Sequence, residues 1–445
     1  MKSRTVKQTD IGTIPEEWEI VSLGDVCSKI GSGITPRGAE KVYKQSGIAL
    51  IRSQNVYNNS FRKEGLVYLD EATAREMENV AVEREDVLLN ITGDSVARCC
   101  TVPEEILPAR VNQHVSIIRT DGGEVNPVFL RYYLTNPRMQ ATMLSLGESG
   151  GTRNALTKGM IERFLIPKPA LVEQTEIARV LSNFDSKIEL NQQMNRTLES
   201  IGTAIFKHWF TDFEFPNEQG RPYKYSGGAM VYSEELGREI PSGWGADRLG
   251  NHSIIKGRIG WKGLQVSEYV EEGPFIVGGT QLVNNRVNWD ECPRVPQTRY
   301  DESPEIMLRR GDILMTKDGT IGKLAFVDEV REPATVASGI FVIRSHSSII
   351  NQMYLWNYFK SYAFGSLVES RVEGSVIPHL YQRDITEMTI VLPTSRIASQ
   401  FEAAANAIQG RFDANSENSR SLNKMRDFLL PKFMSGKVRV PVEVR

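Results

Sequence analysis

The feature that most constrains this 445-residue chain is a long internal repeat. The stretch IPEEWEIVSLGDVCSKIGSG begins at Ile14 and returns from Ile240 as IPSGWGADRLGNHSIIKGRIG, 226 residues later. The run DVLLN at Asp86 likewise reappears as DILMT at Asp312, at the same offset. This unit is far longer than the roughly 20–50 residues of a solenoid repeat, so the sequence predicts two copies of a whole domain.

Length and composition agree with two domains. The 445 residues leave room for two domains of ordinary size, and 40% hydrophobic with 24% charged residues is typical of a soluble globular protein. No segment approaches the ~20 consecutive apolar residues that span a bilayer, and the N-terminus lacks the apolar run of a signal peptide. We therefore expect a cytoplasmic protein with no membrane partner.

Both copies predict an α+β domain. The first has short runs of β-branched residues, broken by Gly, Pro and Asn, and a helical pattern over Pro127–Thr135. The second repeats this order, with its helix over Met353–Tyr362. The predicted fold class is α+β, with two duplicated α/β domains and two long helices.

Each domain leads into one of these long amphipathic helices. The apolar stripe is narrow, which favours a coiled coil over a helix lying on a globular core. Asn191 and Asn415 fall at matched positions of the stripe, and they predict either a buried pair that fixes the register or an open, solvated middle section. The stripe also includes Ile201 and Met425. The residues predicted to pair the helices are Ile188, Asn191, Leu198, Ile205, Phe412, Asn415, Leu422 and Leu429.

These patterns give the boundaries of the segments. They are a first domain at 1–170, a first helix at 171–212, a linker at 213–238, a second domain at 239–393, a second helix at 394–436 and a tail at 437–445. Because Pro and Gly interrupt the linker, we expect it to cross the surface, and we expect the tail to be peripheral.

The sequence holds no persuasive catalytic constellation. Asn126-Pro127-Val128-Phe129 is similar to the tetrapeptide of DNA amino-methyltransferases but lacks its second Pro, so a helix-opening Pro is the better interpretation. The five histidines and four cysteines show no metal-ligand spacing. We expect a chain with no catalytic residue and no metal site.

Polar loops at corresponding places in the two copies are the candidates for DNA contact. Arg, Lys, Asn and Gln read base edges in the major groove, and cations face phosphates. With 53 Lys and Arg against 55 Asp and Glu, a DNA-binding chain of this kind must segregate its charges. For each residue, base contact, phosphate contact and simple solvation all stay open. The candidates are Thr35, Arg37, Arg52, Asn55, Asn90, Thr92, Asn112, Gln113, Arg153, Lys158, Arg258, Lys262, Gln281, Lys317, Thr320, His379, Gln382 and Arg383.

Taken in order along the chain, these motifs resemble the specificity subunit of type I restriction-modification enzymes. The marks are Ile-Pro-x-x-Trp at Ile14 and Ile240, the run GDILM…DGTIG from Gly311, the junction FKHWFTDFEFPNE from Phe206, and the two helices. The resemblance covers essentially the full length. The first copy departs from the GDILM pattern, with Glu85 in place of the first Gly.

The resemblance implies two target-recognition domains, each reading one half of a bipartite, asymmetric site in double-stranded DNA. It implies that the two duplicated α/β domains are separated by an antiparallel coiled coil of the two long helices. It also implies two methyltransferase subunits as partners and, through them, restriction subunits with motor and nuclease activity. S-adenosylmethionine, ATP and Mg2+ are expected on those partner subunits, with no cofactor bound directly by this chain. Two alternatives stay open: a self-sufficient DNA methyltransferase or nuclease, and a coiled-coil scaffold that does not read sequence.

Overall fold

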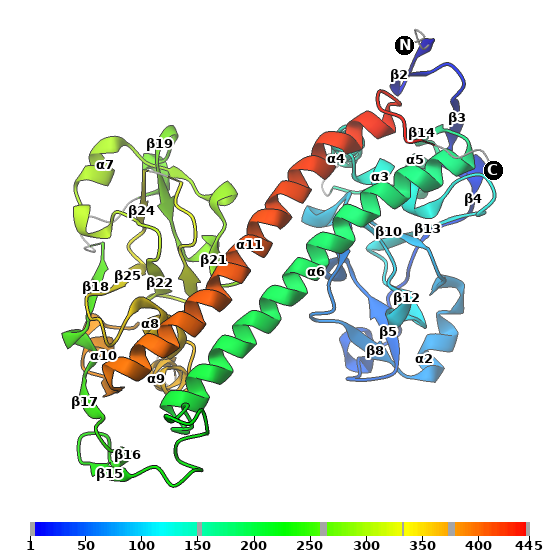
Figure 1. Ribbon diagram of the computed structural model, residues 1–445. Helices are drawn as coiled ribbons and strands as arrows, with labels where there is room; N and C mark the ends of the chain where they lie inside the picture. Colours follow the sequence, from blue (N-terminus) through cyan, green and yellow to red (C-terminus); the bar gives the residue numbers. More distant parts are fainter. Residues whose placement is uncertain (1–4, 149–153, 259–264, 332, 373–378, 442–445) are drawn as a thin grey trace. The chain divides into compact units, whose positions relative to one another are not determined.

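The computed structural model describes residues 5–148, 154–258, 265–331, 333–372 and 379–441. The chain divides into two compact units: unit 1 is Met1–Asn191 with Asn418–Arg445, and unit 2 is Gln192–Glu417. Both divisions fall inside the long helices α6 (Leu171–Phe210) and α11 (Ser395–Met434), which run through the middle of Figure 1. Each unit therefore contains one half of each long helix.

Unit 1 is built on two four-stranded sheets. The first is antiparallel, with the order β11-β10-β13-β4 (Cys99–Thr101, Val87–Asn90, Val115–Thr120 and Cys27–Ser32). In the second, with the order β8-β5-β12-β9, strand β12 runs parallel to β5 (Val67–Leu69, Ile48–Ile51, Ala109–Val111 and Ala81–Val82). Two-stranded pairs are β1-β2 (Val6–Thr9, Gly12–Pro15), β14-β3 (Leu165–Lys168, Glu19–Ser22) and β6-β7 (Val56–Tyr57, Ser60–Phe61). The shorter helices are α1 (Leu23–Val26), α2 (Glu71–Glu76), α3 (Pro127–Thr135), α4 (Pro137–Glu148) and α5 (Lys158–Glu162).

Unit 2 repeats this order of elements. Its antiparallel sheet is β18-β25-β22-β23 (Ser253–Gly257, Ile340–Ser345, Ile313–Thr316 and Leu324–Phe326). Strand β19 runs parallel to β24 (Val270–Val277, Ala334–Val336), as β5 does to β12. The remaining pairs are β15-β16 (Met230–Ser233, Arg238–Pro241), β17-β26 (Gly245–Arg248, Thr389–Leu392) and β20-β21 (Leu282–Val283, Arg286–Val287). The shorter helices are α7 (Gln297–Asp301), α8 (Gln352–Tyr358), α9 (Tyr362–Val372) and α10 (Gln382–Thr386).

A buried ion pair anchors the central strand of the antiparallel sheet in each unit. Arg119 donates from Nε and Nη2 to the two oxygens of Asp86, at 2.7 and 2.8 Å. In unit 2, Arg344 makes the same two hydrogen bonds to Asp312, at 2.6 and 2.7 Å. Both aspartates are buried, and a buried carboxylate is tolerated only with such a partner. This explains why the aspartate that opens DVLLN returns in DILMT.

The two long helices pair in antiparallel fashion within each unit. In unit 1, Nδ2 of Asn191 donates to Asn418 and to Ser419, both at 3.1 Å. In unit 2, Nδ2 of Asn415 donates to Oδ1 of Asn195 at 3.0 Å. Asn191 and Asn415 are both buried, but each bonds a different asparagine, because an antiparallel pair brings position 191 opposite 419. The predicted coiled coil is confirmed. Of the two interpretations of Asn191 and Asn415, a pair between them is wrong, and their burial contradicts an open, solvated section at these two positions.

The apolar stripe of the long helices differs in part from the predicted one. Ile201 and Met425 are 43% and 54% exposed. In the second half of α6, Phe206 is buried one position beyond the predicted Ile205, and Phe210 is buried one turn later. The inward face is therefore rotated by about one residue there, because these rings pack against the domain core of unit 2.

The helix predicted over Pro127–Thr135 is confirmed as α3, whereas the one predicted over Met353–Tyr362 is two helices. Helix α8 ends at Tyr358, and α9 begins at Tyr362. The carbonyl of Ser361 accepts from the N–H of Gly365 at 3.0 Å, so a new helical turn opens there. Tyr362 is consequently 87% exposed.

The start of the linker is packed against unit 2, whereas much of the remainder is exposed, in agreement with the predicted surface excursion. Phe213 and Phe215 are both 3% exposed, and the Phe215 ring stacks between Tyr223 and Trp244, with centroids 4.5 and 4.8 Å away. The β15-β16 hairpin, which begins in the linker, corresponds to β1-β2 of unit 1. Phe213 and Phe215 thus belong to the core of unit 2, whereas Tyr225 is 88% exposed.

The tail is also packed, where the sequence predicts a peripheral segment. Arg439 donates to both carboxylate oxygens of Glu173 and to Glu17, and Val440 is 8% exposed. Trp18 Nε1 donates to Glu173 at 3.3 Å, so the tail closes over the first repeated motif. A charged side chain in the last residues carries this contact, which an apolar pattern does not reveal.

Candidate nucleic-acid interface

In unit 1, loops from distant parts of the chain meet at the end of the central strand β10. The N–H of Ile91 donates to the carbonyl of His114 at 3.0 Å. The N–H of Leu156 donates to the carbonyl of Ile91 at 2.8 Å, and Thr92 forms a β-bridge with Ala155. Backbone hydrogen bonds thereby hold together the three loops around Thr92, His114 and Leu156, which we call the backbone frame.

Unit 2 builds the same backbone frame at the end of β22. The N–H of Lys317 donates to the carbonyl of Gly339, and the N–H of Leu380 donates to the carbonyl of Lys317, both at 2.9 Å. Asp318 forms a β-bridge with His379. These residues lie 224 to 226 positions after their counterparts in unit 1. The frame is therefore duplicated, and the side chains it displays are not.

In unit 1 the frame displays a small hydrogen-bonded chain of side chains. Gln113 Nε2 lies 2.9 Å from Nε2 of His114, and Thr92 Oγ1 lies 2.6 Å from Nδ1 of the same ring. If the amide of Gln113 donates to Nε2, then Nδ1–H donates to Thr92, because a neutral imidazole has one donor and one acceptor. Gln113 is exposed, so the rest of its amide faces outward.

In unit 2 the frame displays an acidic side chain and two aromatic rings. Nδ1 of His379 donates to Oδ1 of Asp318, since an ionised carboxylate can only accept. The two side chains are 34% and 44% exposed. The ring of Tyr381, itself 55% exposed, packs edge-on against His379 with the centroids 4.5 Å apart. Lys317 Nζ lies 5.5 Å from the centroid of the Phe341 ring.

Asn55 and Gln281, both predicted to contact DNA, close the same turn in the two units. Asn55 Oδ1 accepts from the N–H of Arg52 at 3.0 Å, and Gln281 Oε1 accepts from the N–H of Gly278 at 3.1 Å. The amide nitrogens donate to Arg62 O at 2.9 Å and Glu291 O at 3.3 Å. We assign both residues a structural role in place of the predicted DNA contact.

Asn90, Asn112 and Arg258 are buried and also depart from the prediction. Asn90 Nδ2 donates to Ser53 O at 2.8 Å, and Asn112 Oδ1 accepts from the N–H of His114 at 3.1 Å. Arg258 is 1% exposed, and its guanidinium donates to two backbone carbonyls and to a threonine hydroxyl. Their polar atoms are directed inward, so a structural role replaces the predicted DNA contact at all three positions.

The other described candidates keep accessible side chains. Lys158 and Gln382 open the equivalent short helices α5 and α10. The exposed candidates are Thr35, Arg37, Gln113, Lys158, Thr320, Gln382 and Arg383. The half-buried ones are Arg52, Thr92, Lys317 and His379. Arg153 and Lys262 lie outside the described residues.

The sequence candidates omit His114, Asp318 and Tyr381, which the frame brings to the same place. Asp318 stands 226 residues after Thr92, a candidate, so the repeat offset itself is the signal that could identify it. Asn126 caps α3 by accepting from the N–H groups of Val128 and Phe129, both at 3.0 Å, which confirms the structural interpretation of that tetrapeptide.

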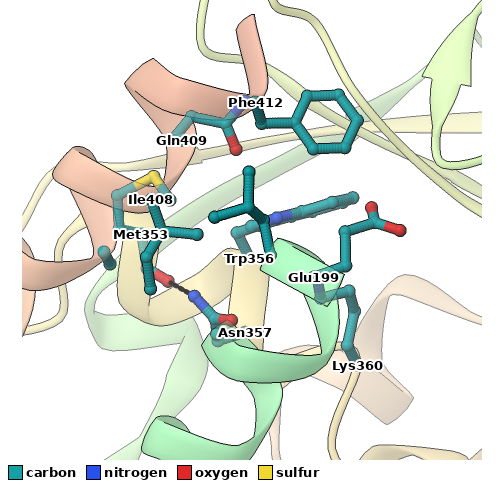
Figure 2. A pocket seen from close by; sticks show the side chains of 11 residues that line it. Glu199, Met353, Trp356, Asn357, Lys360, Ile408, Gln409 and Phe412 are labelled. Atoms are coloured by element: carbon teal, nitrogen blue, oxygen red, sulfur yellow. Dashed lines mark hydrogen bonds between the residues drawn. The ribbon is translucent and has the colours of Figure 1, made fainter. Parts of the chain in front are cut away.

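Unit 2 contains a cavity of about 20 Å³ against α6, α8 and α11 (Figure 2). Asn357, Gln409, Trp356 and Glu199 are among the residues that line it. A space of this size holds about one water molecule. Its lining residues come from these three helices and from Lys360 in the turn after α8, and do not include the residues of the loop frame.

Two further properties concern the described part of the chain. Within it, no group of three or more His, Cys, Asp or Glu side chains is placed to hold a metal ion. None of the helices in the described ranges has both the length and the apolar character needed to cross a membrane.

Comparisons with known proteins agree with this architecture. The protein-family model for the type I restriction modification DNA specificity domain matches residues 15–200. The chain is 28% identical to the type I restriction enzyme MjaIX specificity subunit of Methanocaldococcus jannaschii, over 98% of this chain and 96% of that protein. It is 22% identical to the putative type I restriction enzyme MjaX specificity subunit of the same organism, over 99% and 98%. The crystal structure of a type I restriction-modification system S subunit from M. genitalium has a similar fold, with TM-score 0.53, 15% identity and coverage of 97% and 98%.

The matched family model makes residues 15–200 a DNA specificity domain, and the repeat places a second copy of its fold after it. Relatives that align with this chain over nearly their whole length are named type I restriction enzyme specificity subunits. The resemblance that the sequence motifs predict is thereby confirmed.

Proposed function

We propose that this chain reads a bipartite, asymmetric site in double-stranded DNA, with one domain for each half-site. One observation carries the proposal: the two units hold the same backbone frame and display different side chains on it. Thr92 with His114 occupies the frame in unit 1, and Asp318 with His379 occupies it in unit 2. A duplicated frame with different polar groups suits two readers of different sequences.

Charge distribution supports DNA as the partner. The chain carries a formal net charge of −2, so its affinity for phosphates depends on local cations. Lys158 and Arg383 are exposed in the segments that follow Leu156 and Leu380 of the frame. Arg37 is exposed after β4, with its Nε 3.9 Å from a carboxylate oxygen of Glu76. These cations suit phosphate contacts.

We further propose that the chain is not itself an enzyme and docks two methyltransferase subunits, which would recruit restriction subunits. S-adenosylmethionine, ATP and Mg2+ would then bind those partners and not this chain. Because its proposed partners are DNA and these subunits, we expect the chain to act in the cytoplasm. Support comes from its relatives, which are named specificity subunits.

The test is a domain exchange in cells that lack other DNA methyltransferases. Residues 239–393 are replaced by the second domain of another specificity subunit, and the chimera is expressed with the methyltransferase subunit of this chain's own host. Mapping of the methylated sites should show one half-site changed and the other retained. A change in both halves would contradict independent readers.

Two further measurements separate the alternatives. Methylation or cleavage of DNA by the purified chain alone would identify a self-sufficient enzyme. A complex that assembles but methylates or protects no defined sequence would identify a scaffold that does not read DNA.

A further inference from the structure

We infer that Asp318 determines a cytosine in the half-site read by unit 2, and that His379 positions its carboxylate. This inference rests on the proposed function and adds a named base and two named residues to it. It follows from the backbone frame, from the pairing of the two side chains and from the hydrogen-bonding chemistry of the bases.

Asp318 lies in the backbone frame of unit 2. Its backbone is fixed by the β-bridge to His379, next to Lys317, whose N–H and carbonyl both take part in the frame. Thr92 holds the equivalent place in unit 1. Because the backbone is the same, the change from a hydroxyl to a carboxylate is a change in what the frame presents outward.

The carboxylate of Asp318 is held by a hydrogen bond and is still accessible. Oδ1 accepts the hydrogen bond from Nδ1 of His379, and the side chain of Asp318 is still 44% exposed. One oxygen is thus held by the protein while the group retains access to a partner outside. A carboxylate held in this way does not have to be ordered when a ligand binds.

Cytosine is the base whose major-groove edge best suits a carboxylate. A carboxylate is repelled by phosphates and accepts hydrogen bonds only, so on DNA it needs a donor at a base edge. In the major groove guanine offers two acceptors and thymine an acceptor with a methyl group. Adenine offers a donor beside the N7 acceptor, which repels a carboxylate, whereas cytosine offers its N4 amino group without an adjacent acceptor.

Asp318→Asn is the decisive variant, because it keeps the size of the side chain and adds a donor. The complex of the full chain with the methyltransferase subunit of its host is expressed, and its methylated sites are mapped. We expect the variant to lose about tenfold or more of the discrimination for cytosine at one position of the unit 2 half-site, and to accept adenine there. The unit 1 half-site should not change.

Three controls accompany this variant. Glu234→Gln removes the same charge from an exposed position in the turn after β15, and should leave the site unchanged. Asp318→Glu keeps the carboxylate and should keep cytosine as the preferred base. His379→Ala should relax the same position as Asp318→Asn and no other, which a purely structural role would not do.

A binding measurement gives the same answer if Asp318→Asn abolishes methylation. Duplexes carry either cytosine or an analogue without the N4 amino group at that position. The wild-type complex should bind the analogue about tenfold more weakly, and the Asp318→Asn complex should bind both alike. Equal weakening of both complexes by the analogue would overturn the inference.

The outcomes distinguish the inference from the proposed function. A wild-type complex that methylates no defined site would overturn the proposed function, and the inference with it. A wild-type complex that methylates a bipartite site, with the same base preference in Asp318→Asn, would overturn the inference alone.

Discussion

Arg426 of α11 donates from Nη1 to Oδ1 of Asp185 on α6, at 2.8 Å. The other oxygen of Asp185 accepts from the hydroxyl of Tyr132 at 2.5 Å, so the carboxylate joins both long helices to α3 within unit 1. The corresponding residues of unit 2 are Gly202 and Gln409, each 224 positions away. Both line the small cavity, so the repeat has an ion pair in one unit and a void in the other.

Arg426→Ala should lower the free energy of unfolding of unit 1. The side chains of Asp185 and Arg426 are 18% and 19% exposed, so the expected loss, about 1–3 kcal/mol, is below that of a fully buried pair. Unfolding in denaturant, monitored by hydrogen exchange of the α6 amides in unit 1, measures this loss of stability. Arg411→Ala, at an exposed position of α11, should change stability by less than about 0.5 kcal/mol. Equal effects of the two variants would show that the ion pair adds nothing.

Gly202→Ala should stabilise unit 2 by up to about 1 kcal/mol. Glycine inside a helix costs about that much relative to alanine. A Cβ at Gly202 would lie 3.2 Å from Oδ1 of Asn357, a close contact that the adjoining cavity allows the amide to relieve. Gly410→Ala, with nothing within 4 Å of its Cβ, is the matched control for the helix effect alone. A Gly202→Ala protein less stable than wild type would show that Asn357 cannot move.

Lys360 should make the stability of unit 2 depend on pH. Loss of solvation lowers the pKa of Lys360 to about 8, with Glu199 raising it and Arg286 lowering it by smaller amounts. Between pH 8 and the unfolded value near 10.5 the unfolded chain binds more protons, so stability rises with pH in this window.

The Lys360→Met variant removes this dependence. It should be more stable than wild type at pH 7, where the folded protein keeps Lys360 charged at a cost, and the difference should shrink by pH 9.5. Denaturant unfolding at both pH values tests it, with the exposed Lys224→Met as control. A difference that does not vary with pH would exclude titration of Lys360 as the cause.

Arg258 and Arg383 should separate folding from DNA contact. Arg258→Ala leaves two carbonyls and a hydroxyl without their donor, so it should destabilise unit 2 by about 3–5 kcal/mol. Arg383→Ala should leave stability nearly unchanged and reduce the slope of log affinity for DNA against log salt by about 1. Thermal unfolding and titrations at several salt concentrations measure the two effects. If Arg258→Ala instead reduced the salt dependence of DNA binding and left stability unchanged, Arg258 would contact DNA as the sequence predicts.

The fold was largely predictable because it depends on patterns that sequence periodicity displays. The repeat offset locates both copies of the strands of the antiparallel sheet. Helix α3 has the predicted bounds because Asn126 and Pro127 mark its start. The packed start of the linker was not predictable in this way, since Phe213 and Phe215 are buried by contacts with Trp244 further along the chain.

The site was predictable by segment and less so by residue. The loops at Thr92 and Gln113 do converge in unit 1, and those at Lys317 and His379 converge in unit 2. Composition cannot tell an exposed amide from one that closes a turn, as Asn55 and Gln281 do. Arg258 shows the same limit for cations, because its burial depends on carbonyls about 40 and 80 residues away in the sequence. Matching the two copies position by position recovers what composition misses, as at Asp318.

The tail should be required for the stability of unit 1. Glu173 is buried, and Arg439 bonds both of its oxygens while lying 5.4 Å from the centroid of the Trp18 ring. Arg439→Ala leaves that carboxylate with only the indole donor, so we expect a loss of about 2–3 kcal/mol, discounted because the Arg439 side chain is 21% exposed. Glu173→Gln removes the charge that needs neutralising, so the double variant should lose less than the sum of the two single losses. Unfolding of all four proteins in denaturant measures this coupling, and additive losses would show that Arg439 stabilises the tail without acting on Glu173.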